Sequence, residues 1–249
     1  MTRKKAFSIH LATSAIIATC ISVPLLLLWY TPDFFAAANA QILLLLLLGV
    51  DVVLGPLITL IIFNSKKSRK ELIFDFSIIA SLQVAALLYG MSISFQARPV
   101  FVAFTQDSFT VAIANQILDI NLERSKHPEF KSLSLTGPVY VYAEMPIDQK
   151  ERDDIEYSKI FGMGLHCFPE YFKPYTENMK IAGQAAKPLS AMTKLADGDI
   201  AVLNKAVKRS GKPESEIGYL PLKGMRKDLT ILLDKNDGKI LDVLQISPE

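Results

Sequence analysis

Three long apolar stretches occupy the first 95 residues of the chain. They cover residues 7–30, 39–63 and 72–94, and short polar connections separate them. A helix of about 20 apolar residues is long enough to cross the hydrocarbon core of a lipid bilayer. The pattern therefore predicts a transmembrane domain of three helices within residues 1–95.

Residues 96–249 have the pattern of a water-soluble domain. Apolar and polar positions alternate over short segments, which is typical of half-buried strands. We expect strands at 100–105, 109–114, 138–145, 228–234 and 240–246, and helices at 115–126, 147–161 and 199–209. Residues 161–188, where prolines and glycines interrupt aromatic residues, are expected to form an ordered loop. The predicted fold class is a membrane protein with three N-terminal transmembrane helices followed by an α+β soluble domain with antiparallel strands.

The first apolar stretch also resembles a secretory signal. Arg3-Lys4-Lys5 could be its basic region, and residues 38–40 (Ala-Asn-Ala) could be a cleavage site. These small residues, however, lie well past the end of the stretch, beyond Trp29 and Tyr30. Aromatic residues of this kind concentrate at membrane interfaces, so we interpret the stretch as a retained transmembrane helix.

Lysine and arginine predict the orientation of the three spans. The N-terminus carries three basic residues, the connection 64–70 carries four, and the connection 31–38 carries none. Basic residues accumulate on the cytoplasmic side of membranes, so we expect the N-terminus and residues 64–70 in the cytoplasm. Three spans then place residues 96–249 on the other side, which in a bacterial inner membrane is the periplasm.

Polar residues inside the second and third spans are candidates for function. A carboxylate in the middle of a bilayer is costly and is therefore rarely incidental. The candidates, which we interpret as an intramembrane polar seam or partner-binding face, are Asp51, Gly55, Pro56, Thr59, Asp75 and Gln83.

The short connection 64–70 makes the second and third spans antiparallel neighbours. Residues equally far from its centre near Lys67 then share a depth, which pairs Asp51 with Gln83 and Thr59 with Asp75. We predict a hydrogen bond between Asp51 and Gln83, and a kink near Pro56, because proline lacks a backbone donor. The seam either docks another transmembrane helix or only sets the register of the two spans.

The soluble part offers no catalytic motif, and we expect no cofactor and no metal ion. His166 and Cys167 are adjacent in sequence, but adjacent residues rarely direct both side chains to one ion or substrate, and no metal-binding spacing accompanies them. Basic and acidic residues are nearly balanced beyond residue 96, which gives no electrostatic case for nucleic acid.

An aromatic group in the expected loop has two interpretations. Its members are Phe161, Phe168, Tyr171, Phe172 and Tyr175, of which the last four are the candidates for a periplasmic contact. Aromatic side chains often anchor protein interfaces, so they could form a periplasmic contact with a partner. The alternative is that they pack in the core of the domain.

The second span closely resembles the signature of the type IV pilin accessory proteins, the TfpX, TfpZ and FimB group. The resemblance is strongest in residues 51–63 (DVVLGPLITLIIF). Further matches lie at 74–79, 83–90, 98–102, 218–222 and 227–230. Residues 123–212 show no clear match.

This resemblance implies an inner-membrane protein that assists pilin stability, pilus assembly or pilus dynamics without catalysis, as an accessory protein or chaperone. The implied partners are the lipid bilayer and the major type IV pilin, whose subunit has one apolar helix in the bilayer and a globular head in the periplasm. A different class of function, a membrane-bound enzyme that modifies or processes pilin, is the alternative.

Overall fold

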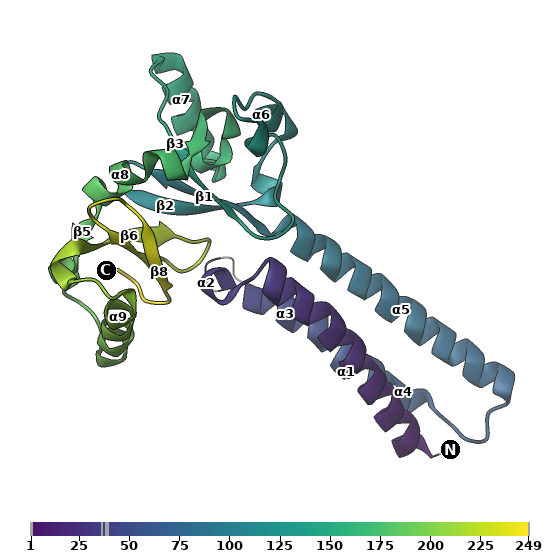
Figure 1. Cartoon of the computed structure of the whole chain (residues 1–249). Coiled ribbons are helices and arrows are strands. Elements are labelled where there is room, and N and C mark those ends of the chain that lie inside the picture. The colour runs from purple at the N-terminus through teal and green to yellow at the C-terminus, as the bar shows by residue number, and fades with distance from the viewer. Residues whose placement is uncertain (1, 36, 38–39, 249) are drawn as a thin grey trace. The chain divides into compact units, whose positions relative to one another are not determined.

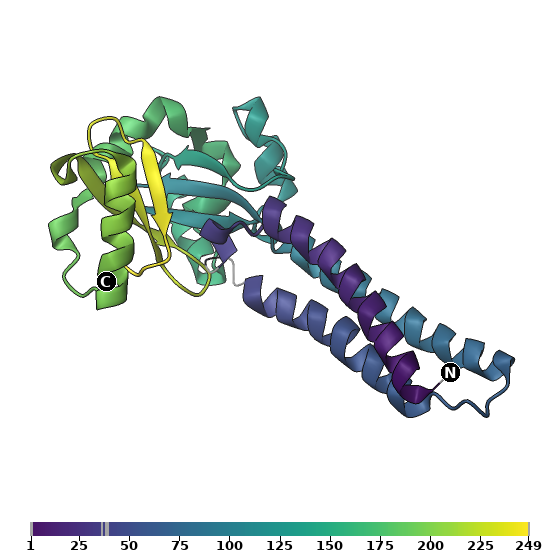
Figure 2. The ribbon, with the colours of Figure 1, turned by 60° about the horizontal axis from the view of Figure 1, so that its bottom comes forward.

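The computed structural model of this chain describes residues 2–35, 37 and 40–248. Its contacts divide the chain into two compact units. The first unit is formed by Met1–Leu28 and Ala40–Gln96, and the second by Trp29–Asn39 and Ala97–Glu249. Figure 1 and Figure 2 show the course of the chain through both units.

Three long helical stretches make up the first unit. They are α1 (Arg3–Leu28), the continuous series α3 (Ala40–Leu48), η1 (Gly49–Leu54) and α4 (Gly55–Ile62), and α5 (Arg69–Gln96). All three are long and apolar enough to cross a membrane, and each lies close to a predicted span. The predicted first residue of the second span, Asn39, lies outside the described residues. Helix α1 packs along α4, and α5 contacts both α3 and α4 (Figure 1).

A π-helical segment, η1, interrupts the second stretch directly before Pro56. The Gly55 amide donates to the carbonyl of Val50, five residues earlier. Pro56 occupies the first turn of α4, where a missing amide donor is tolerated. Short π-helical segments of this kind interrupt helices near proline and other kink sites, and they are frequent at functional sites. Here the π-helical segment contains Asp51.

The second unit is built on one sheet. Within the described residues its strands are β1 (Pro99–Thr105), β2 (Ser108–Ile113), β3 (Val139–Ala143), β4 (Phe172–Pro174), β5 (Lys187–Pro188), β6 (Ile217–Lys223), β7 (Leu229–Asp234) and β8 (Ile240–Leu244). Its described helices are α2 (Pro32–Phe35), α6 (Asp119–Glu123), α7 (Gln149–Ser158), α8 (Tyr175–Ala185) and α9 (Asp197–Ser210). The strand order is β4-β3-β1-β2-β6-β7-β8, and β5 also pairs with β6.

The sheet is mixed, so the predicted purely antiparallel arrangement is wrong. The two predicted hairpins are confirmed as β1–β2 and β7–β8, both antiparallel. However, β3 runs parallel to β1, and β6 runs parallel to β2. Hairpin turns are local signals, whereas parallel pairs join strands through long crossovers that leave no mark in the pattern of either strand.

Strand β1 is buried on both faces, which explains its almost continuous apolar sequence. Val102 and Phe104 point into a core shared with α8, β6 and β7. Phe101 and Ala103 point into the opposite core, to which α7 contributes Ile155. A third core lies between α9 and strands β6 to β8. Helices therefore cover both faces of the sheet.

Helix α8 and strand β6 are among the elements that differ from the sequence expectation. Helix α8 lies inside the expected loop 161–188, and it is held by burial of Tyr175 and Ala182 in the core. Strand β6 carries Pro221, which usually argues against a central strand. Along one edge of β6, Pro221 lies between the residues that pair with β5 and those that pair with β2, and along the other edge it stands opposite Thr230 of β7. Both elements depend on contacts with distant parts of the chain.

The first connection, which follows α1, belongs to the second unit. The Trp29 Nε1 donates to the carbonyl of Leu135 at 2.8 Å. Phe34 and Ala37 are buried in the core next to β1 and β7, and the Ala37 carbonyl accepts from the amide of Met225 at 2.9 Å. This connection is therefore part of the domain formed mainly by residues 97–249.

The turn between β7 and β8 is tightly packed against α8. Gly238 has a positive φ of 78°, and a Cβ atom there would lie 1.7 Å from the carbonyl oxygen of Met179. The Gly238 carbonyl also accepts a hydrogen bond of 2.7 Å from the Tyr175 hydroxyl. A side chain at this position is therefore excluded by space as well as by backbone conformation.

We expect Gly238→Ala to lower the free energy of unfolding of the second unit by about 2–4 kcal/mol, because it adds a backbone clash to the strain of a positive φ. Gly211→Ala is the matched control: Gly211 has a similar φ of 68° but open space around its Cα, and the strain alone costs about 1 kcal/mol. Denaturant unfolding of the full-length protein in detergent, followed by the fluorescence of its single tryptophan, measures both. Equal losses would contradict the proposed clash.

Candidate functional site

A polar cluster joins the three long helical stretches of the first unit. His10 of α1 lies 2.6 Å from the Thr59 hydroxyl through Nδ1 and 2.9 Å from Gln83 Oε1 through Nε2. Thr59 belongs to α4 and Gln83 to α5, so one imidazole connects all three. His10 is not among the candidate residues predicted from the sequence. Its only signal there was a lone polar ring within an apolar stretch.

Gln83 is the centre of this cluster. Its Nε2 donates to the backbone carbonyl of Asp51 at 3.1 Å, which directs its Oε1 toward His10. Since Oε1 can only accept, His10 Nε2 must be the donor, and a neutral imidazole then accepts from the Thr59 hydroxyl at Nδ1. The cluster therefore forms a chain of hydrogen bonds in which each donor meets an acceptor.

Asp51 and Gln83 lie next to each other as predicted, but the predicted bond to the Asp51 side chain is wrong. Gln83 bonds the main-chain carbonyl instead, which faces α5 from the π-helical segment. The side chain of Asp51 is buried, with 5% of its surface exposed. Its Oδ1 atom has no hydrogen-bond partner within the described residues. A buried polar atom without a partner is costly and marks a place where another group can bind.

Gly55 provides the room that Gln83 needs. A Cβ atom at Gly55 would lie 2.1 Å from Gln83 Nε2 and 2.6 Å from its Cδ. The predicted close approach at Gly55 is therefore that of a side-chain amide. Pro56, next in sequence, is buried in the first turn of α4.

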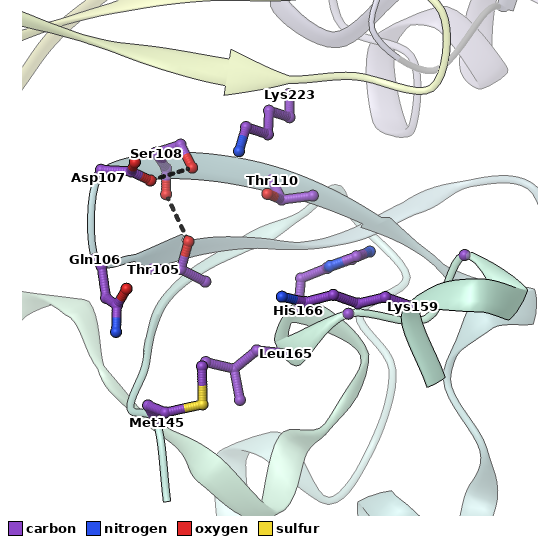
Figure 3. Close-up of a pocket in the computed structure, with 12 residues that line it drawn as sticks. Thr105, Gln106, Asp107, Ser108, Thr110, Met145, Lys159, Leu165, His166 and Lys223 are labelled. Carbon is purple, nitrogen blue, oxygen red and sulfur yellow. Dashed lines mark hydrogen bonds between the residues drawn. The ribbon is translucent and has the colours of Figure 1, made fainter. Parts of the chain in front are cut away.

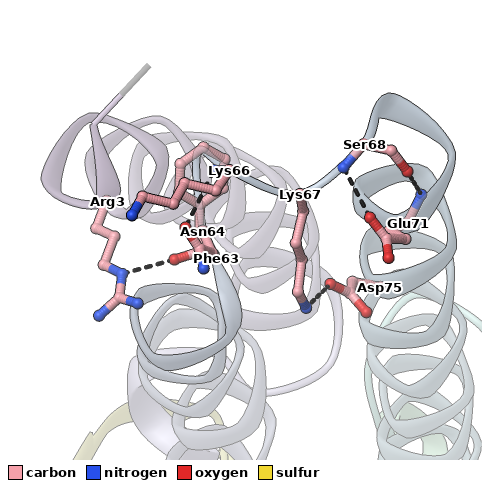
Figure 4. A network of polar contacts seen from close by, with 8 residues as sticks. All are labelled: Arg3, Phe63, Asn64, Lys66, Lys67, Ser68, Glu71 and Asp75. Carbon is pink, nitrogen blue, oxygen red and sulfur yellow. Dashed lines mark hydrogen bonds and ion pairs between the residues drawn. The ribbon is translucent and has the colours of Figure 1, made fainter.

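Asp75 takes no part in this cluster. Lys67 in the second connection reaches its carboxylate at 2.6 Å (Figure 4), so Asp75 forms an ion pair with this lysine. Nearby, the Ser68 amide donates to the Glu71 carboxylate and the Glu71 amide to the Ser68 hydroxyl, a reciprocal cap on the first turn of α5. The Lys67 ammonium is a charged donor on a flexible side chain, so its bond to the Asp75 carboxylate is stronger than one from a neutral hydroxyl.

Two grooves flank Gln83 in the first unit. One, of about 210 Å³, lies between α1 and α5, and its polar lining includes His10, Ser14 and Asp51. The other, of about 250 Å³, lies between the second stretch and α5 and includes Gly55 and Asp75. The remaining lining is largely apolar. Asp51, whose Oδ1 has no partner within the described residues, thus lines a largely apolar groove. The groove is large enough for a few side chains.

The aromatic residues proposed as a periplasmic contact are mostly internal. Phe172 and Tyr175 are buried in the two main cores of the second unit. Phe168 and Tyr171 are partly buried against the core that contains Phe172. For Phe172 and Tyr175, packing in the core is therefore the interpretation that the structure supports. Phe161 of the same aromatic group is exposed, and its ring contacts that of the exposed Tyr157, with centroids 5.7 Å apart.

His166 and Cys167 do not form a reactive pair. Burial raises the pKa of the Cys167 thiol to about 12, so the thiol stays protonated near neutral pH. Burial, and secondarily the Lys223 ammonium, lower the pKa of His166 to about 4. Both Cys20 and Cys167 are free thiols. Within the described residues, no group of three or more His, Cys, Asp or Glu side chains is arranged to hold a metal ion.

Comparison with known proteins finds relatives of one kind. The fimbrial assembly protein of serogroup E1 from Dichelobacter nodosus is 29% identical over 93% of this chain and 91% of its own length. The fimbrial assembly protein of serogroups C1 and C2 from the same organism is 36% identical over 46% of this chain and 87% of its own length. No family profile and no solved structure matches the chain.

We expect Gly55→Ala to displace the Gln83 amide and break its bonds to His10 and Asp51, because the new methyl group would occupy the same space. Gly49→Ala is the matched control, since Gly49 lies in the same helical stretch with open space around it. NMR of the full-length protein with labelled histidines reads this out: the His10 ring resonances should move in Gly55→Ala and stay in Gly49→Ala. Unmoved His10 resonances in both variants would contradict the cluster.

Lowering the pH from 7 to 5 should reduce the free energy of unfolding of the second unit through His166. An unfolded histidine takes up a proton near pH 6.5, whereas folded His166 does so near pH 4. Between these values the unfolded chain holds the extra proton, so folding becomes less favourable as the pH falls, by about 1–2 kcal/mol at pH 5.

Urea unfolding at the two pH values, followed by Trp29 fluorescence, measures this effect. The variant His166→Gln should show a smaller loss between pH 7 and pH 5 than the parent protein. The control His127→Gln changes a histidine that is partly exposed at the surface, and it should retain the loss of the parent. An unaltered pH dependence in His166→Gln would contradict the assignment.

Proposed function

We propose a function that follows from the family of this chain. The chain belongs to the fimbrial assembly protein family, the type IV pilin accessory proteins. Its role lies in pilus assembly, and we propose that it binds and stabilises the major pilin as a non-catalytic accessory protein. The partner contacts would be an intramembrane groove for the apolar pilin helix and the second unit for the pilin head.

The arrangement of the connections supports insertion of the first unit in the bacterial inner membrane. The first connection packs within the second unit through Trp29, Phe34 and Ala37, so both must lie on one side of the membrane. The N-terminal segment and the second connection then share the opposite side of the membrane. Both are rich in lysine and arginine, which favours the cytoplasm for that side. The second unit is accordingly proposed to be periplasmic.

The observation that carries the intramembrane contact is the unpartnered Oδ1 of Asp51. In hydrocarbon, a polar atom without a partner costs free energy that a hydrogen-bond donor would recover. The groove beside Asp51 is otherwise apolar. A pilin helix that is apolar but carries a donor group at this depth would fit both features.

The proposed seam residues then have different roles. Gly55 and Gln83 hold the cluster together with Thr59, while Asp51 faces the partner. Pro56 shapes the helix beside the π-helical segment. Asp75 is bound to Lys67 near the second connection, so it anchors the end of α5 and is no longer proposed as a partner contact.

We assign the proposed contact with the pilin head to the exposed residues at the end of α7. Tyr157, Ile160 and Phe161 are each more than 60% exposed, and they form an apolar group next to the acidic surface of α7. Apolar aromatic residues at the surface are common anchors of interfaces. They replace Phe172 and Tyr175, whose side chains are occupied in the cores.

Photocrosslinking in living cells tests this proposal. A photoreactive residue at Ile17, which lines the groove beside Asp51, and another at Phe161 should each trap the major pilin. Ile16 is the matched control for Ile17: it is an exposed isoleucine on the same helix but outside the lining of either groove, so it should trap lipid or little protein.

Pilin captured equally at Ile16 and Ile17 would argue against a specific groove, and capture of other pilus components alone would argue against pilin as the partner. The intact mass of pilin in a strain lacking this protein separates assembly from enzymatic processing. An unaltered mass is expected, and a changed mass would favour the enzyme.

A further inference from the structure

A pocket of about 360 Å³ opens in the second unit and is lined in part by His166 (Figure 3). It lies between the turn that joins β1 and β2, the end of β6, and the segment from Lys159 to His166. Its polar lining includes Thr105, Ser108, Thr110, Lys159, His166 and Lys223. These groups come from three separate parts of the chain, so the pocket exists only in the folded domain.

The backbone holds His166 closely in this wall. Gly164 lies directly beside its ring, and a Cβ atom at Gly164 would come within 3.1 Å of His166 Nδ1. Gly162 takes a positive φ of 76° in the same segment, which ends the helical turn after α7. Gly164 thus allows the main chain to approach the imidazole, while Gly162 allows the backbone turn before it.

Two lysines supply positive charge at the pocket. Lys223 stands beside Thr110 in the parallel pairing of β2 with β6, and it has no ion-pair partner within the described residues. Lys159 pairs with Glu156, but about half of each side chain is exposed, and such pairs contribute little. Figure 3 shows Lys223 near Thr110 on the strand side of the pocket and Lys159 running alongside His166. The Lys159 ammonium can therefore turn to a new partner at small cost.

One carboxylate, that of Asp107, reduces the net positive charge of the pocket. Asp107 lies at the rim of the pocket, where it accepts a hydrogen bond of 3.0 Å from the Ser108 hydroxyl. Among the described lining residues it is the only acidic one. His166 is neutral near pH 7, because burial and Lys223 lower its pKa to about 4. A neutral imidazole can still donate one N–H bond, so the pocket offers two ammonium groups with hydroxyl and imidazole donors around them.

We propose that this pocket binds an anionic oxygen group, a carboxylate or a phosphate, between Lys159 and Lys223, with the Thr110 hydroxyl and the His166 imidazole as further donors. Ammonium groups bind such oxygens through charge-assisted hydrogen bonds, which are stronger than neutral ones. The volume is at the lower end of the range for small-molecule sites, so it suits a compact anion or a single acidic group of a larger ligand. This inference stands on the second unit alone and is independent of pilin binding.

NMR of the full-length protein in detergent tests the site, with the histidines labelled and the His166 signal assigned from His166→Gln. Sodium phosphate and sodium succinate are titrated separately at constant ionic strength. A saturable shift of the His166 ring resonances is expected with at least one of them, together with a rise in the His166 pKa, since a bound anion stabilises the protonated ring. The more effective anion identifies the preferred group as phosphate or carboxylate.

Matched variants separate a built site from general charge attraction. Lys223→Gln should weaken binding about tenfold or more, as expected for loss of one charge-assisted bond. Lys205→Gln removes an exposed lysine on α9, outside the pocket, and should leave affinity unchanged. Trp29 fluorescence confirms that both variants are folded. The proposal is overturned if neither anion gives a saturable shift, or if the two variants bind equally well.

Discussion

The carboxamide of Gln83 needs a donor and an acceptor inside an apolar group of helices, and this requirement organises the first unit. Leaving either side unbonded in such surroundings would cost several kcal/mol, on the order of a large share of the stability of a small domain. His10 on α1 and the main-chain carbonyl of Asp51 meet the need, and Gly55 leaves the space. All three helical stretches are therefore tied together at one depth.

The same geometry leaves Asp51 incomplete. Its carbonyl serves Gln83, while its buried Oδ1 atom finds no partner within the described chain. A segment of π-helix makes this arrangement possible, because it departs from regular α-helical hydrogen bonding just before Pro56. The contact that stabilises the first unit and the group proposed to bind pilin are thus adjacent features of one residue.

The second unit has well-packed cores that hold both the first connection and Cys167. Phe34 and Ala37 are buried in one of these cores and Trp29 donates to the carbonyl of Leu135, so the first connection is fixed by contacts with distant residues. Cys167 is protonated and buried, which removes the one nucleophile that its sequence neighbourhood suggested. The surface carries an apolar group at the end of α7 and a pocket with two lysines, on which the two binding proposals for this unit rest.

The sequence by itself determined the three apolar helices, both β-hairpins, helix α9 and the family, because these depend on local periodicity, turn residues and a motif. It also placed Asp51 and Gln83 at one depth, since a short connection makes two helices antiparallel neighbours. Only the tertiary structure decided that His10 joins them, that Lys67 takes Asp75, and that β3 and β6 pair in parallel. The reason is physical: each of these choices is made between segments distant in sequence, where a polar atom or a strand edge takes whichever partner the folded chain brings within reach.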